Sequence, residues 1–78
     1  MVPIKWVWTD HIKWQMIERK IPKELVETSL GNPDGVVPGK HSRLIYQKLI
    51  EDKLIRVVTE NNRLITVYLT DKVKKYMK

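Results

Sequence analysis

Two tyrosines and two cations have the types and spacing expected of an RNA-binding surface. Tyr46 and Lys48 are two residues apart, and Tyr68 lies in a later run of similar composition. Alternate residues of a β-strand share a face, so these side chains can stand on one sheet surface together with Arg56. Tyrosine rings stack on bases, and Lys and Arg bind phosphates. The same residue types are also common on the solvated face of an ordinary antiparallel sheet.

A polar stripe near the start of the chain includes a histidine that could transfer protons. His11, Gln15 and Arg19 are spaced four residues apart and would lie along one side of a helix. His11 would act as an acid or base, and Arg19 would clamp a phosphate at the sheet edge. For a lone histidine, a local hydrogen bond near the helix start is the commoner role.

The composition excludes several kinds of site. The 78 residues contain no cysteine and only two histidines, which excludes a disulfide framework, a thiol nucleophile and an intrachain Cys/His zinc site. Phosphate-binding glycine loops, nucleophile elbows and helical metal motifs are absent from the sequence. No apolar run approaches the ~20 residues of a membrane span. We therefore expect a cytoplasmic protein outside the membrane, with neither a metal nor a cofactor.

The charge is basic and unevenly distributed. Fifteen Lys and Arg oppose nine Asp and Glu, for a net charge of +6. Residues 1–30 carry five positive and four negative groups, whereas residues 31–78 carry ten against five. Lys74 and Lys75 in the basic tail are candidate phosphate contacts, whose contribution to affinity would fall with rising salt. A solubilising tail would have the same composition.

The chain predicts a single domain of residues 1–78, of the α+β class. In residues 1–9, large apolar side chains recur at every second position, which predicts an N-terminal strand. Residues 10–30 predict a helical hairpin, residues 43–70 an antiparallel β-meander, and residues 71–78 a basic tail. The order is β-α-α-β-β-β, with the hairpin packed on one face of the sheet.

Local signals place the element bounds. Thr9 or Asp10 can cap a first helix from Asp10 to Arg19, and Ile21-Pro22 breaks it before a second helix from Pro22 to Leu30. The segment between the second helix and the meander contains Pro and Gly turn signals and predicts a loop. Three β-rich runs follow: Arg43–Ile50, Lys53–Thr59 and Leu64–Thr70.

Loop parity decides which strand residues face the helices. Two-residue loops in both hairpins would put Arg56 among apolar residues and bury an unpaired guanidinium at considerable cost. Neither turn contains the Asn-Gly or Asp-Gly that favours a two-residue loop. We therefore expect odd effective loop lengths, with Tyr46, Arg56 and Tyr68 together on the face away from the helices. The helix-facing set would be Ile45, Leu49, Ile55, Val57, Ile65, Val67 and Leu69.

Three tryptophans are unusual for so short a chain. Trp6, Trp8 and Trp14 would most simply pack in the core with their N–H groups satisfied. If they were exposed as a cluster, they would instead mark an interface with another protein.

Short motifs recur in an order that resembles a known family. The motifs are His11, Gln15-Met16, Glu18-Arg19, Ile21, Asn32-Pro33-Asp34, Arg43-Leu44-Ile45-Tyr46, Arg56-Val57-Val58 and Ile65-Thr66-Val67-Tyr68. In this combination the chain resembles domain-of-unknown-function family 4258, whose members look like relatives of the RelE/ParE toxin superfold. The resemblance implies a small sheet with two helices on one face. Gln15 departs from the pattern, since the family more often has arginine there.

The resemblance also implies a function and a set of site residues. It implies a toxin-type protein that cleaves or binds RNA, with RNA or the ribosome as its partner. It also implies an acidic antitoxin protein that covers the active surface. The implied catalytic residues are His11 for proton transfer, Arg56 for charge stabilisation and Tyr68 for base orientation. The resemblance also implies Arg19 and Tyr46, which together with Arg43, Lys48, Lys74 and Lys75 make up the predicted RNA-binding set. The alternative is a non-catalytic module of the same fold that binds a protein through its tyrosines or tryptophans.

Overall fold

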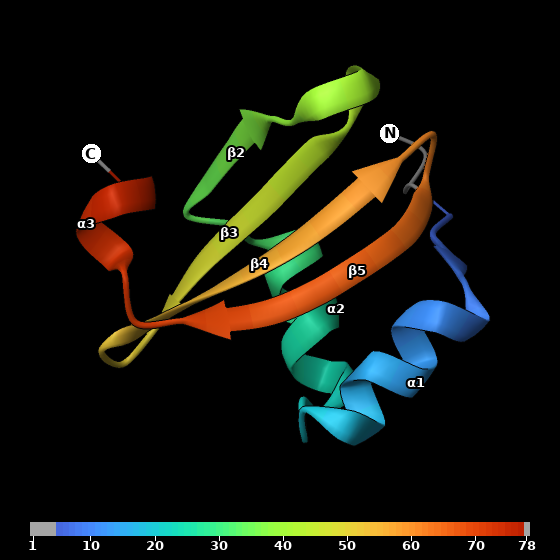
Figure 1. Cartoon of the computed structure of the whole chain (residues 1–78), viewed down its shortest axis with the longest axis horizontal. Helices are drawn as coiled ribbons and strands as arrows, with labels where there is room; N and C mark the ends of the chain where they lie inside the picture. Colours follow the sequence, from blue (N-terminus) through green and yellow to red (C-terminus); the bar gives the residue numbers. More distant parts are fainter. Residues whose placement is uncertain (1–4, 78) are drawn as a thin grey trace.

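The computed structural model describes residues 5–77 and shows a mixed α+β fold. The five strands form one sheet in the order β1-β5-β4-β3-β2, in which β1 is parallel to β5 and the other neighbours are antiparallel. Helices α1 and α2 lie together on one side of the sheet, and α3 lies apart from them beside β2 (Figure 1). The elements are β1 (Val7–Trp8), α1 (Asp10–Glu18), α2 (Lys23–Gly31), β2 (Gly35–Pro38), the 3₁₀ turn η1 (Lys40–Ser42), β3 (Leu44–Ile50), β4 (Lys53–Glu60), β5 (Arg63–Thr70) and α3 (Val73–Tyr76).

The helical hairpin and the meander confirm the predictions to within one residue at each bound. Two other segments differ. The predicted loop between α2 and β3 contains the strand β2 and the turn η1. Of the predicted N-terminal strand, only Val7–Trp8 is a strand, and residues 1–4 lie outside the described range. No helix in the described range is long and apolar enough to cross a membrane.

Capping contacts explain where the helices begin and end. Thr9 is the N-cap of α1: its hydroxyl oxygen accepts from the backbone N–H of Ile12 at 3.3 Å and donates to the Leu64 carbonyl at 2.6 Å. At the C-terminal end of α2, the ammonium group of Lys48 donates to the Asn32 carbonyl at 3.0 Å. A cation at a helix C-terminus complements the negative end of the helix dipole. These contacts tie both helices to the sheet.

One apolar cluster joins α1 and α2 to the sheet. The helices contribute Ile12 and Val26, which are both fully buried. On the sheet side, Leu64 occupies the place in the core that the prediction gave to Ile65. The buried members of the cluster are Ile12, Ile21, Val26, Leu30, Ile55, Val57, Leu64 and Val67.

The loop between β3 and β4 contradicts the predicted parity. Ile50 pairs with Lys53, so the loop consists only of Glu51 and Asp52. Glu51 adopts a left-handed conformation with a φ of 58°, which allows the tight turn. The loop therefore has even length, and every side chain of β3 points to the face opposite to the one predicted.

Tyr46 is the residue most affected by this change. It pairs with Val57 and packs against the core on the helix side of the sheet. The prediction that Tyr46 shares a face with Arg56 and Tyr68 is therefore wrong. Ile45 and Leu49, predicted to face the helices, lie instead on the opposite face, which we call the outer face.

The hairpin between β4 and β5 has the predicted phase, although its loop is not of odd length. Its turn, Asn61-Asn62, is also two residues long, and both residues have positive φ (48° and 68°). A register shift then leaves Ile65 without a partner in β4, as in a β-bulge. The extra residue makes the effective count odd. Arg56 and Tyr68 are therefore directly paired on the outer face, as predicted.

Candidate functional site

Arg56 is the centre of a polar group on the outer face. Its side chain is only 8% exposed, although it is a cation in the middle strand of the meander. The Nε donates to Gln47 Oε1 at 2.8 Å, and Nη1 donates to the hydroxyl of Tyr68. Gln47 and Tyr68 flank Arg56 in the sheet register, one on each neighbouring strand. The three strands thus present a guanidinium held by two neutral partners.

The C-terminal residues cover this polar group. The ring centroid of Tyr76 lies 3.9 Å from the guanidinium carbon of Arg56, and that of Tyr68 lies 5.7 Å away. Met77 contributes its sulfur, which accepts from the Gln47 Nε2 at 3.3 Å. A cation over an aromatic face is stabilised by the quadrupole of the ring. The basic tail is therefore folded on the outer face as α3, and it brings a third ring to the site.

A shallow groove borders the covered arginine. Its volume is about 470 Å³, and it lies between β2 and the C-terminal residues. Lys75 lines this groove, and its ammonium group is 5.4 Å from the Tyr76 ring centroid. One carboxylate, that of Asp34, also lines it, and one oxygen of that group accepts from the backbone N–H of Leu49 at 2.8 Å. The groove offers a cation and a ring on one side and a hydrogen-bonded carboxylate on the other.

Several predicted site residues lie away from Arg56. Tyr46 stacks edge-on against Trp6 at 5.4 Å between centroids, on the helix side. Lys48 is engaged at the end of α2. Arg43 pairs weakly with Glu60, at 3.9 Å from Nε to Oε1. The predicted RNA-binding set is thus dispersed over the molecule, and only Lys74 and Lys75 accompany Arg56 and its rings.

The polar stripe of α1 seals an edge of the sheet. Gln15 is buried, and its Oε1 accepts from the Thr66 hydroxyl at 2.5 Å and from the backbone N–H of Val67 at 3.2 Å. Arg19 Nη1 donates to the Val67 carbonyl at 2.7 Å. These two side chains satisfy the backbone groups of β5 that no neighbouring strand reaches. His11, in contrast, is exposed in the first turn of α1.

The sequence patterns did not point to three important residues. Gln47 and Tyr76 hold Arg56, and Gln15 was interpreted as a missing cation, whereas its amide oxygen is the group that binds β5. Gln47 could have been found from its position, because a two-residue loop between β3 and β4 places it opposite Arg56. The prediction that the tryptophans pack in the core is confirmed for Trp6 and Trp8, which pack against it, and is wrong for Trp14, which is 61% exposed.

Metal chemistry has no evident centre in the part of the chain that is described. No group of three or more His, Asp or Glu side chains in residues 5–77 is arranged to hold a metal ion. The outer face presents cations, phenols and an amide, which bind anions and stack on planar groups, beside the carboxylate of Asp34.

Comparison with known proteins places the chain in a family. No curated protein and no solved structure matches it. A family model described as Domain of unknown function (DUF4258) matches residues 8–69. The match covers most of the chain, from β1 almost to the end of β5, and includes Gln15, Gln47, Arg56 and Tyr68. The chain therefore belongs to the DUF4258 family.

Proposed function

We propose that the chain is an RNA-binding protein with a RelE/ParE-like architecture that acts in the cytoplasm. The observation that carries the proposal is the guanidinium of Arg56 beside the rings of Tyr68 and Tyr76. Arginine stays charged at physiological pH, and no carboxylate of residues 5–77 forms a salt bridge with it. A phosphate group is the natural complement of such a cation. Two helices on one side of an antiparallel meander support the architectural part.

RNA would first meet the exposed parts of this group. Arg56 is almost covered, whereas Tyr68 and Tyr76 are half-buried and Lys74 and Lys75 are exposed. Stacking of a base on an aromatic side chain contributes about 1–3 kcal/mol, as judged by alanine substitution. The lysines would bind the backbone phosphates, and Arg56 would hold the rings in place and add its charge.

Binding without cleavage is the form of the proposal that the geometry supports. Attack by a 2′-hydroxyl needs a proton acceptor and a charge stabiliser at the same phosphate. His11, the predicted acceptor, is on α1, which belongs to the helical layer, whereas Arg56 faces the other side of the sheet. We therefore expect RNA to be bound and to remain intact.

Fluorescence anisotropy with a short fluorescein-labelled oligouridine tests the proposal. The affinity should fall with rising salt, and Lys74→Ala/Lys75→Ala should reduce the slope of log affinity against log salt by about 0.7 for each lysine that pairs with a phosphate. The matched control is Lys5→Ala/Lys40→Ala, which removes the same charge from exposed positions outside the site. If both double variants weaken binding equally, the RNA is held by net charge alone and the proposed site is wrong.

The same samples test for cleavage. Oligouridine recovered after incubation and separated on a denaturing gel should be full-length. If shorter products formed with the wild type but not with His11→Ala, the protein would be a ribonuclease, and the separation of His11 from Arg56 would have to close during the reaction.

A further inference from the structure

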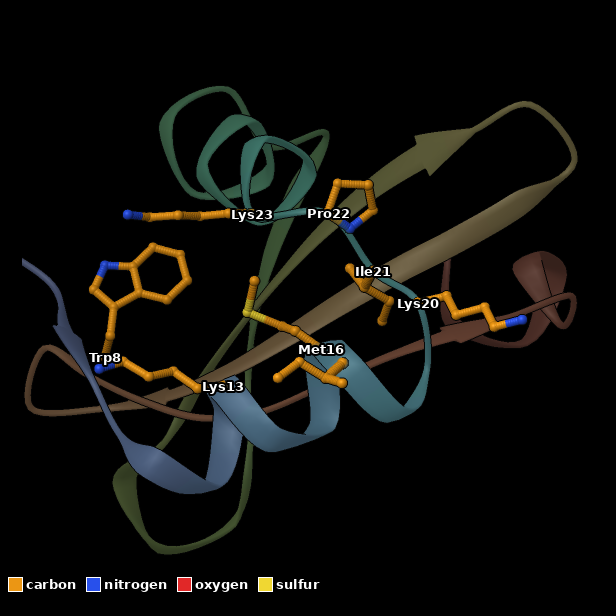
Figure 2. A pocket seen from close by; sticks show the side chains of 8 residues that line it. Trp8, Lys13, Met16, Lys20, Ile21, Pro22 and Lys23 are labelled. Atoms are coloured by element: carbon orange, nitrogen blue, oxygen red, sulfur yellow. The ribbon is translucent and has the colours of Figure 1, made fainter.

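A second surface lies on the helical side, away from Arg56. A cleft of about 520 Å³ opens between α1 and the beginning of α2 (Figure 2). Its floor is apolar, and the side chain of Met16 crosses the middle (Figure 2). The apolar lining consists of Trp8, Met16, Ile17, Ile21 and Pro22. An open apolar cleft of this kind is a candidate for docking, since large exposed apolar patches are uncommon on monomeric proteins.

All the charges that line the cleft are positive. Lys13 and Lys23 stand near the Trp8 end, and Lys20 stands at the opposite end (Figure 2). The ammonium group of Lys23 lies 5.2 Å from the Trp8 ring centroid. None of the acidic residues of the two helices, Asp10, Glu18, Glu24 and Glu27, lines the cleft. The cleft therefore pairs an apolar floor with a rim of cations.

The apolar surface extends beyond the cleft along α1. Ile17 lines the cleft and is 78% exposed, and Trp14 is 61% exposed one turn earlier on the same helix. A small molecule in the cleft would leave Trp14 in water. A polypeptide segment laid along α1 would cover Trp14 and Ile17 together and reach the lysines at both ends.

We infer that this cleft docks an acidic amphipathic helix of a partner protein. The apolar side chains of the partner helix would pack on the floor of the cleft, as in other complexes in which a helix binds in a groove. Its carboxylates would pair with Lys13, Lys20 and Lys23. Charge complementarity argues against a second copy of the chain, which carries a net +6 and would be repelled. RNA could stack a base on Trp8, but the rest of the floor (Met16, Ile17, Ile21 and Pro22) is aliphatic and suits apolar side chains better.

Designed peptides test the inference directly. The first is a helical peptide with leucines along one face and glutamates flanking that face. The second replaces the glutamates with lysines, and the third replaces the leucines with serines. Titrated into ¹⁵N-labelled protein, the first peptide should shift the amide signals of residues 13–23 and bind at least about tenfold more tightly than either of the others. Signals of β4 should not move.

Variants of the protein locate the binding. Ile17→Glu should abolish binding of the first peptide, and Lys13→Ala/Lys20→Ala should weaken it about tenfold and remove most of its salt dependence. Lys5→Ala/Lys40→Ala is again the charge-matched control and should bind like the wild type. Because Ile17 is exposed, an unchanged amide spectrum of the free Ile17→Glu variant would show that its fold is intact.

Three outcomes would overturn the inference. The first is equal affinity for the glutamate and lysine peptides. The second is a set of shifts centred on α3 or β4, which would move the acidic partner to the outer face. The third is sedimentation of the free protein as a dimer that Ile17→Glu dissociates, which would assign the apolar surface to a second copy. Each result is independent of the oligouridine measurements, because the two surfaces share no residue.

Discussion

Tyr76 covers Arg56 at 3.9 Å from the ring centroid to the guanidinium carbon, which ties the last helix to the central strand of the meander. The sulfur of Met77 adds a second tie through Gln47. A helix as short as α3 does not hold itself together in water, so its position depends on these contacts. The contacts that cover Arg56 are therefore the same contacts that hold the C-terminal segment in place.

Tyr76→Ala should lower the free energy of unfolding by about 1–2 kcal/mol, because it removes the ring over the cation and uncovers Arg56. Tyr76→Phe should change it by less than about 0.5 kcal/mol, since the hydroxyl makes no hydrogen bond within residues 5–77. Urea denaturation of both variants makes the comparison. Equal stability of Tyr76→Ala and the wild type would mean that α3 contributes nothing to the fold.

The two tyrosines that were predicted to share a face should respond differently to loss of their hydroxyls. Tyr68→Phe removes the acceptor of a charged donor and should cost about 1–2 kcal/mol, somewhat discounted for partial exposure. Tyr46→Phe should cost less than about 0.5 kcal/mol, because its ring packs against Trp6 without a hydrogen bond from its hydroxyl in the described range. If both tyrosines shared the face of Arg56, as the sequence predicted, thermal unfolding would show similar losses for the two variants.

Gln15→Leu should expose the edge of β5. The backbone N–H of Val67 would lose its acceptor, at a cost of about 1–3 kcal/mol. Amide hydrogen exchange at Val67 should accelerate more than exchange at Val57 in the adjacent strand. Gln15→Glu is the control, since a carboxylate can still accept, and protection should persist there. An arginine at this position has no acceptor, so a family member that carries one must seal the edge differently.

The sequence predicted the elements well because their signals are local. Thr9 caps α1 with its own hydroxyl, and Pro22 is the N-cap of α2. The strand β2 was not predicted because prolines and glycines lie at its two ends and beside it, a composition that is common in edge strands. Local signals were sufficient to predict most helices and strands and their bounds, and insufficient to predict how the strands pair.

The prediction of strand phase failed at one residue. Glutamate is not among the residues that favour a left-handed turn, so nothing in Glu51-Asp52 indicated a two-residue loop. The physical argument behind the prediction, that an unpaired buried guanidinium is costly, was sound. The chain meets that cost by another route: Arg56 is buried with Gln47, Tyr68 and Tyr76 as partners. These partners come from three separate segments, and no single-sequence pattern brings them together.

The left-handed conformation of Glu51 gives a final prediction about that turn. A non-glycine residue at a φ of 58° carries a steric cost that asparagine tolerates better than glutamate. Glu51→Asn should therefore raise the free energy of unfolding by about 0.5–1 kcal/mol. Asn61, with a φ of 48° in the other hairpin, provides the reciprocal variant, and Asn61→Glu should lower stability by a similar amount.

Urea denaturation at high ionic strength separates this backbone effect from charge, because Glu51→Asn also removes a negative group from a basic protein. The gain should persist in high salt if the conformation of the turn is its source. A gain present only at low salt would assign the effect to removal of the charge, which repels the neighbouring Asp52. A loss in both conditions would show that the side chain of Glu51 stabilises the turn in spite of its backbone conformation. Because this turn fixes the parity of β3, the variant should also leave Tyr46 packed against Trp6, which the amide spectrum of β3 would report.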